Sequence, residues 1–111
     1  VETLLDSQAV LVERTGSERT STAATVVTML SSAMTARRKR YLVMNAPEDR
    51  VERIAELIPG MEAPTVVPLT EAGMVAIHSV VDGADVWHVL PKLRTAGASG
   101  ILVLPVQQVL A

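Results

Sequence analysis

The chain has 111 residues, of which 49% are hydrophobic and 20% charged, with a net charge of −2 and no cysteine. This length suits one compact domain with little beyond it, and its core must be aliphatic because there is one Trp, one Tyr and no Phe. Disulfides, thiolate metal ligands and cysteine nucleophiles are excluded, and the near-neutral charge argues against nucleic-acid binding. No apolar run reaches the roughly 18 residues of a membrane span, and no signal-peptide pattern opens the chain. We therefore expect a cytoplasmic protein without a membrane partner.

The first forty residues predict a strand followed by a connecting helix. Residues 1–15 contain a short apolar run, 9–12, that is typical of one strand, and no hairpin partner follows it. We expect its sheet to lie elsewhere, in a longer protein from which this chain is a fragment, since the first residue is Val. Residues 16–40 form the predicted connecting segment, with a helix over 22–36. One face of that helix carries an apolar stripe, which we expect to be buried: Ala23, Val26, Val27, Leu30, Ala33 and Met34.

A basic tetrad, residues 37–40, ends this helix. Its cations complement the negative end of the helix dipole, which favours a solvated helix terminus. The alternative is a phosphate or nucleic-acid patch, although no aromatic residue besides Tyr41 accompanies the tetrad for stacking.

From Tyr41 onward the pattern alternates regularly between strands and helices. A strand over 41–45 precedes a helix that begins near Pro47 and stops at 59–60. Strands follow over 65–69 and 74–81, joined by a short turn. The buried positions of the first of these helices are expected to be Val51, Ile54, Ala55 and Ile58.

The last helix is expected to open at Asp82 as N-cap, with Asp85 as the acid of a capping box. Pro91 should loosen it, Gly97 should cap its C-terminus, and a fourth strand follows over 101–104. The order strand–helix–strand–strand–helix–strand predicts an α+β fold, a ferredoxin-like βαββαβ sandwich over residues 41–111.

The residues carry little catalytic chemistry of their own. Neither His78 nor His88 belongs to a cluster with metal-ligand spacing, so we expect no metal in this chain. The serines lack a nucleophile-elbow motif, and no glycine-rich phosphate loop opens a helix. Polar residues at strand ends, Asn45, Thr65 and Ser99, could hold a small zwitterion or merely satisfy turns. We expect the chain alone to be non-catalytic.

Several segments resemble the C-terminal regulatory domain of long-form ATP phosphoribosyltransferases. They are the strand YLVMNAP at 41–47, the run LIPGMEAPTVVPL at 57–69, GMVAIH at 73–78 and GASGILVLP at 97–105. The opening LDSQAVL at 5–11 is similar to the last strand of that family's catalytic part. This explains an unpaired strand at the start of the chain.

The resemblance implies a function in the first step of histidine biosynthesis. It implies a ferredoxin-like domain that makes trimer-like contacts within a homo-hexamer and binds L-histidine as a feedback inhibitor between neighbouring copies. The residues that it places in the effector site are Asn45, Met61, Thr65, Ser79, Val80 and Gly100. ATP, phosphoribosyl pyrophosphate and Mg²⁺ belong to the catalytic part, which this chain lacks, and no cofactor is expected here.

Two alternatives remain open at this point. The domain could assemble the enzyme without binding an effector, since Asn45 and Thr65 could be structural. It could also be a free-standing trimeric domain that binds a small ligand such as a nucleotide or an anion. The absence of a phosphate loop disfavours the latter.

Overall fold

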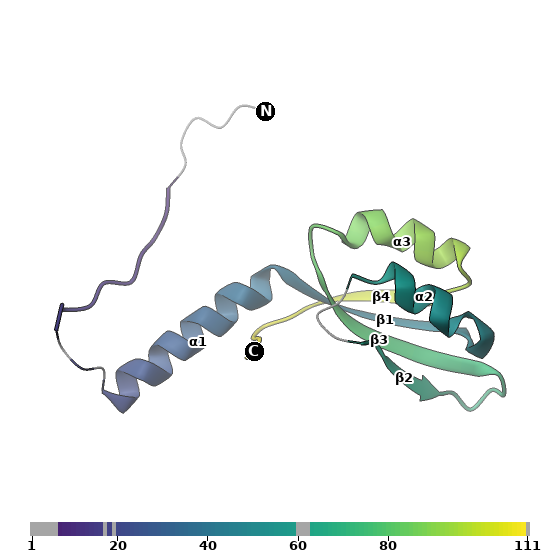
Figure 1. The fold of residues 1–111 in the computed structure, drawn as a ribbon, viewed down its shortest axis with the longest axis horizontal. Coiled ribbons are helices and arrows are strands. Elements are labelled where there is room, and N and C mark those ends of the chain that lie inside the picture. The colour runs from purple at the N-terminus through teal and green to yellow at the C-terminus, as the bar shows by residue number, and fades with distance from the viewer. Residues whose placement is uncertain (1–6, 17, 19, 60–62, 111) are drawn as a thin grey trace.

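The computed structural model describes residues 7–16, 18, 20–59 and 63–110. Figure 1 shows a long helix that leads into a four-stranded sheet with two shorter helices. The elements are α1 (Ser21–Arg37), β1 (Lys39–Pro47), the 3₁₀ turn η1 (Glu48–Arg50), α2 (Val51–Leu57), β2 (Thr65–Pro68), β3 (Met74–Asp82), α3 (Val86–Thr95) and β4 (Ser99–Pro105). The predicted α+β, ferredoxin-like order of elements is confirmed.

The sheet is antiparallel throughout, with the strand order β2-β3-β1-β4. The two long strands, β1 and β3, occupy its centre, and the short strand β2 and the strand β4 form its edges. Each helix therefore crosses from a strand to one that is not its neighbour, as in a split βαβ unit. The pairing of β1 with β4 shifts register between Val43 and Asn45, which marks an irregularity there.

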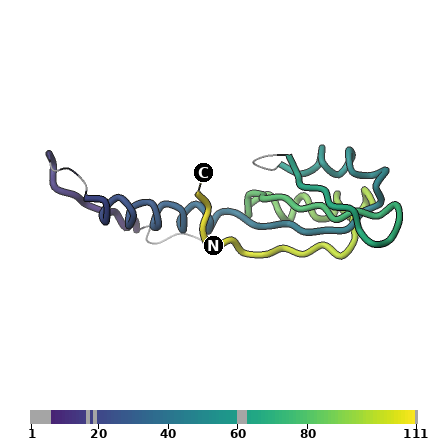
Figure 2. Tube along the Cα trace, turned by 90° about the horizontal axis from the view of Figure 1, so that it is seen from below, coloured from purple at the N-terminus to yellow at the C-terminus, as the bar shows by residue number. Residues whose placement is uncertain are grey.

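The core lies between the sheet and the helices α2 and α3, which cover the same face of the sheet (Figure 2). Alternate residues of the central strands point into it, because successive side chains of a strand face opposite sides. The largest fully buried side chains are Leu42, Met44, Ile54, Ile77, Leu93 and Val81. Of the stripe predicted for α2, Ile54 and Ile58 are buried, and Val51 packs against the core.

The predicted start of α3 is wrong. Asp82 is the last residue of β3, where it lies opposite Lys39 of β1, and the Lys39 Nζ is 2.6 Å from its carboxylate. With this carboxylate engaged by a cation, the helix begins later, at Val86, and Asp85 takes the N-cap position without a capping side-chain hydrogen bond. The helix continues through Pro91, and Gly97 follows its end at φ +111°, as a C-terminal cap requires.

The long helix α1 projects away from the sheet (Figures 1 and 2). Thr20 caps it, since its hydroxyl accepts a hydrogen bond from the Ala23 amide at 3.1 Å. The prediction that its apolar stripe is buried is wrong for this chain, because Val26 and Met34 of the stripe are 46% and 66% exposed. The opposite side of α1 is covered instead. On that side Ser32 is buried, and its carbonyl accepts a hydrogen bond from the Val109 amide at 3.1 Å.

Residues 7–14 pair with no strand among the described residues, and their apolar side chains Val10, Leu11 and Val12 are exposed. That they complete a sheet outside this chain stays a prediction. The predicted division of the chain into a terminal strand (1–15), a connecting segment (16–40) and a sandwich domain (41–111) also stays a prediction. The helix α1 lies within the connecting segment, and β1 begins at Lys39.

Replacement of a core leucine tests this packing. Leu93→Ala removes a fully buried side chain of α3, so we expect the free energy of unfolding to fall by about 2–5 kcal/mol. Leu110→Ala is the matched control, because Leu110 is 75% exposed and its loss should change stability by less than about 0.5 kcal/mol. Urea denaturation followed by circular dichroism measures both. Equal effects of the two substitutions would contradict the assigned core.

Candidate functional site

The face of the sheet turned away from α2 and α3 is uncovered in this chain, and we call it the open face. Alternation along β1 places Tyr41, Val43 and Asn45 on it, since Leu42 and Met44 between them are buried under the helices. The antiparallel register places residues of the other strands on the same face. His78 of β3 lies opposite Val43 of β1 on one side and opposite Thr65 of β2 on the other. Other positions of this face are mainly aliphatic: Val67, Ala76, Val80, Leu102 and Leu104.

A polar group of three side chains interrupts this aliphatic surface. The Tyr41 hydroxyl and the His78 Nδ1 form a hydrogen bond of 2.8 Å, and the two rings meet edge to face with centroids 5.7 Å apart. Thr65 stands beside His78 on the edge strand β2. Tyr41 and His78 are diagonal neighbours across β1 and β3, a spacing that aromatic side chains span. The contact holds both rings in a defined place on the open face.

A pocket of about 260 Å³ opens at this polar group. Its volume lies just below the roughly 300–1,000 Å³ of typical ligand pockets, which suits a small organic ligand. The described lining is mixed, with hydroxyl and imidazole groups among small aliphatic side chains, and none of these described residues is acidic, Lys or Arg. Its residues are Tyr41, Ala63, Thr65, His78, Ser79, Val80 and Val109.

Three of the predicted site residues, Thr65, Ser79 and Val80, line this pocket together. Thr65 is exposed and available, whereas Ser79 is buried opposite Leu42, so alternation turns its side chain toward the helices. Met61 lies outside the described residues.

The other two predicted residues, Asn45 and Gly100, lie together elsewhere on the sheet. A Cβ on Gly100 would stand 3.7 Å from the Asn45 Nδ2, and Gly100 has φ +56°, a conformation that favours glycine. Thr65 and Asn45 are two strands and two residues apart in the register, which places their Cα atoms about 12 Å apart. A single copy thus presents two separate parts of the predicted site on one face.

The sequence-based prediction left Tyr41 and His78 out of the site, since His78 belongs to no cluster with metal-ligand spacing. It is half-buried, but it lies at the centre of the polar group, between Thr65 and Tyr41. Alternation counted from Asn45 puts Tyr41 on the same face, and that signal was present in the sequence. The register of β3 against β1 and β2 was not, so His78 could not be placed.

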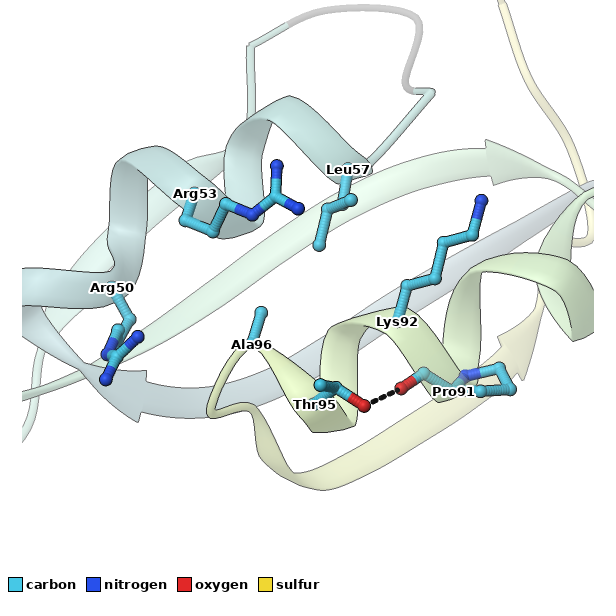
Figure 3. Close-up of a pocket in the computed structure, with 7 residues that line it drawn as sticks. All are labelled: Arg50, Arg53, Leu57, Pro91, Lys92, Thr95 and Ala96. Carbon is cyan, nitrogen blue, oxygen red and sulfur yellow. Dashed lines mark hydrogen bonds between the residues drawn. The ribbon is translucent and has the colours of Figure 1, made fainter.

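A second depression, of about 580 Å³, lies between α2 and α3 on the other side of the molecule (Figure 3). Arg50, Arg53 and Lys92 line it, but their charged ends do not converge on one point, and Arg50 points away from the other two. Arg53 has Glu56 at 3.5 Å, and the Thr95 hydroxyl donates to the Pro91 carbonyl at 3.0 Å. This groove lacks the convergent donors of an anion site.

The basic tetrad at 37–40 is largely explained by the fold. Lys39 pairs with Asp82, and the Arg40 guanidinium donates to the Arg37 carbonyl at 3.0 Å and to the Lys39 carbonyl at 2.7 Å. Arg38 is the C-cap of α1. These contacts favour the helix-terminus interpretation over a phosphate patch.

Within the described ranges, no three His, Asp or Glu side chains gather closely enough to hold a metal ion. Among the same residues, no helix has the length and apolar character needed to cross a membrane. The candidate site is therefore the open face, with its pocket and its polar group.

Comparison with known proteins agrees with this architecture. The model of the family described as "HisG, C-terminal domain" matches residues 36–108, which include all four strands and both short helices. An ATP phosphoribosyltransferase of Bacteroides thetaiotaomicron is 35% identical over 112 residues, which covers 99% of this chain and 40% of that protein. One from Methanocaldococcus jannaschii is 45% identical over 86 residues, or 77% of this chain and 30% of the relative.

The chain thus spans about 40% of the length of the relatives that it matches along almost its whole sequence. The family model covers the sheet, α2, α3 and the described pocket-lining residues other than Val109. The chain belongs to the family of HisG C-terminal domains.

Proposed function

We propose that this chain is the L-histidine-binding regulatory part of an ATP phosphoribosyltransferase, the enzyme of the first step of histidine biosynthesis. The named relatives support this, since they match 99% of the chain. The rest of such an enzyme would bind ATP, phosphoribosyl pyrophosphate and Mg²⁺. In this proposal the metal ion belongs to the rest of the enzyme, and this chain itself is expected to hold no cofactor. Substrates of this kind imply a cytoplasmic enzyme.

The observation that carries the proposal is the pocket on the open face. It combines hydroxyl and imidazole groups with aliphatic walls, as a site for a small amphipathic molecule must. L-Histidine has an ionised end that needs hydrogen-bond partners and a flat ring that packs on aliphatic surface. Thr65 supplies a hydroxyl to the ionised end, and Val80 supplies aliphatic contact.

A second copy of the chain would complete the site. Leu102 and Leu104 on β4 are 58% and 40% exposed, and such a continuous apolar surface is typical of an interface. Association through this face, in trimer-like contacts within a hexamer, would bring Asn45 and Gly100 of one copy toward Thr65 of its neighbour. The effector would then lie between copies and be enclosed by both.

Regulation would follow from this position. Histidine bound between copies stabilises the packing that has the better-formed site, and shifts the assembly toward it. If that packing is the inactive one, inhibition is the difference in binding free energy between the two packings, and it needs no contact with the catalytic residues.

The second candidate function is assembly without effector binding. It is favoured by the same exposed leucines, which would drive association whether or not a ligand is present. The two functions differ in one measurable property, which is saturable binding of L-histidine by the associated chain. The match to a named enzyme along 99% of the chain favours both of these functions over a free-standing signalling domain.

Substitution of the threonine on β2 tests effector binding. Thr65→Ala removes one hydrogen-bonding group from the pocket, so we expect L-histidine affinity to weaken by roughly 1–2 kcal/mol, or about 5- to 30-fold. Calorimetric titration of the associated chain measures this. Thr28→Ala is the control, because the Thr28 hydroxyl donates to the Ala24 carbonyl within α1, away from the sheet. Unchanged affinity in a folded Thr65→Ala variant would remove Thr65 from the site, and absence of saturable binding by the wild type would leave the assembly function.

A charge on the open face tests the interface. Leu102→Lys would bury an ammonium group between copies, so we expect the dissociation constant of the oligomer to rise at least about tenfold. Light scattering over a dilution series measures the oligomeric state. Glu52→Lys makes the matched control, because Glu52 is exposed on α2, on the covered side of the sheet. An oligomer that resists Leu102→Lys would show that copies associate through another surface.

A further inference from the structure

The hydrogen-bonded pair of Tyr41 and His78 is the most defined polar feature of the open face. The 2.8 Å bond fixes both side chains against each other, and both line the pocket beside Thr65. Neither residue is explained by the core, since both lie on the face opposite to it. Packing in the hydrophobic core therefore does not explain this pair.

The tautomer of His78 decides the direction of this hydrogen bond, because either the Tyr41 hydroxyl or an Nδ1–H can donate. A neutral imidazole has one nitrogen that donates and one that accepts. Within the described structure the Tyr41 hydroxyl has no other hydrogen-bond partner than the His78 Nδ1. If the hydroxyl donates to Nδ1, its proton is used and His78 carries its own proton on Nε2. The pair thus leaves an imidazole N–H free for a further acceptor.

The remaining lining of the pocket indicates which acceptor fits. None of the described lining residues is Asp or Glu, so they offer an ammonium group no carboxylate partner. The hydroxyl of Thr65 adds a second donor on the neighbouring strand, opposite His78. Two donors on adjacent strands suit a carboxylate, which only accepts hydrogen bonds and forms stronger ones than a neutral group does.

We propose that Tyr41 and His78 form the carboxylate-recognition element of the effector pocket. His78 contacts the carboxylate of the bound amino acid through Nε2–H, and Tyr41 acts as a positioning residue that holds the ring in the tautomer with Nδ1 unprotonated. This inference rests on the proposed histidine binding, and it names the residues that select an amino acid over a molecule with the same ring and no carboxylate.

Two ligands and three proteins test it. The chain is titrated calorimetrically, at a concentration where light scattering shows it to be associated, with L-histidine and with L-histidinol, whose carboxylate is replaced by a hydroxymethyl group. We expect the wild type to prefer L-histidine about tenfold or more, the worth of one charge-assisted hydrogen bond. His78→Ala should lose affinity for L-histidine and bind both ligands about equally. His78→Gln, whose amide keeps an N–H donor, should restore part of the preference.

The positioning role of Tyr41 has a spectroscopic readout. Tyr41→Phe keeps the ring contact and removes the hydroxyl, so the side-chain nitrogen spectrum of His78 should change from the single Nε2–H form to a mixture of tautomers. The preference for L-histidine should fall at the same time. His88→Ala is the control for both measurements, because His88 is exposed on α3, away from the pocket.

The outcomes separate this inference from the function on which it rests. Failure of the associated wild type to bind L-histidine overturns the proposed function and the inference together. Binding by the wild type with the same preference for L-histidine in His78→Ala overturns the inference alone. An equal loss of affinity for both ligands in His78→Ala would also overturn the inference, because it would show that His78 only packs against the ligand. Loss of the preference, partly restored by His78→Gln, supports it.

Discussion

One-sided burial of the sheet is the constraint on which the other features of this domain depend. The helices α2 and α3 pack on the same face, and alternation along β1 assigns Leu42 and Met44 to that face and Tyr41 and Asn45 to the other. A chain of this size has no further element in the described structure to cover the second face. The packing that stabilises the domain therefore also exposes the surface on which its ligand and its neighbours are expected to bind.

Much of this fold could be predicted from the sequence because local signals were strong. The apolar periodicity of residues 51–58 and the glycine after α3 identified elements whose core contacts and cap the structure confirms. The start of α3 was mispredicted because Asp82 is a good N-cap by residue type, whereas its carboxylate pairs with Lys39 across the sheet. That partner is 43 residues away in sequence, so no local pattern reveals it.

The site was predictable only in part, for a related physical reason. The family resemblance placed Thr65 and Asn45 in the effector site. The strand register shows that both lie on the open face, in two separate parts of that site. His78 belongs to the candidate site because β3 pairs with β1 and β2, and this pairing is visible only in the folded sheet. The apolar stripe on α1 was predicted to be buried, but it is exposed in this chain. Amphipathic periodicity indicates that a helix face will be covered, but it does not say by which chain.

The effector site that we propose lies between copies, on the open face of the sheet. Binding and association must then be thermodynamically linked, since a site made by two copies exists only in the assembly. Titration of L-histidine at several chain concentrations, across the range in which light scattering shows dissociation, measures this linkage directly. We expect the apparent affinity for L-histidine to rise as the chain associates, and L-histidine to stabilise the oligomer. An affinity that stays constant while the oligomer dissociates would place the ligand within a single copy and would contradict a site between copies.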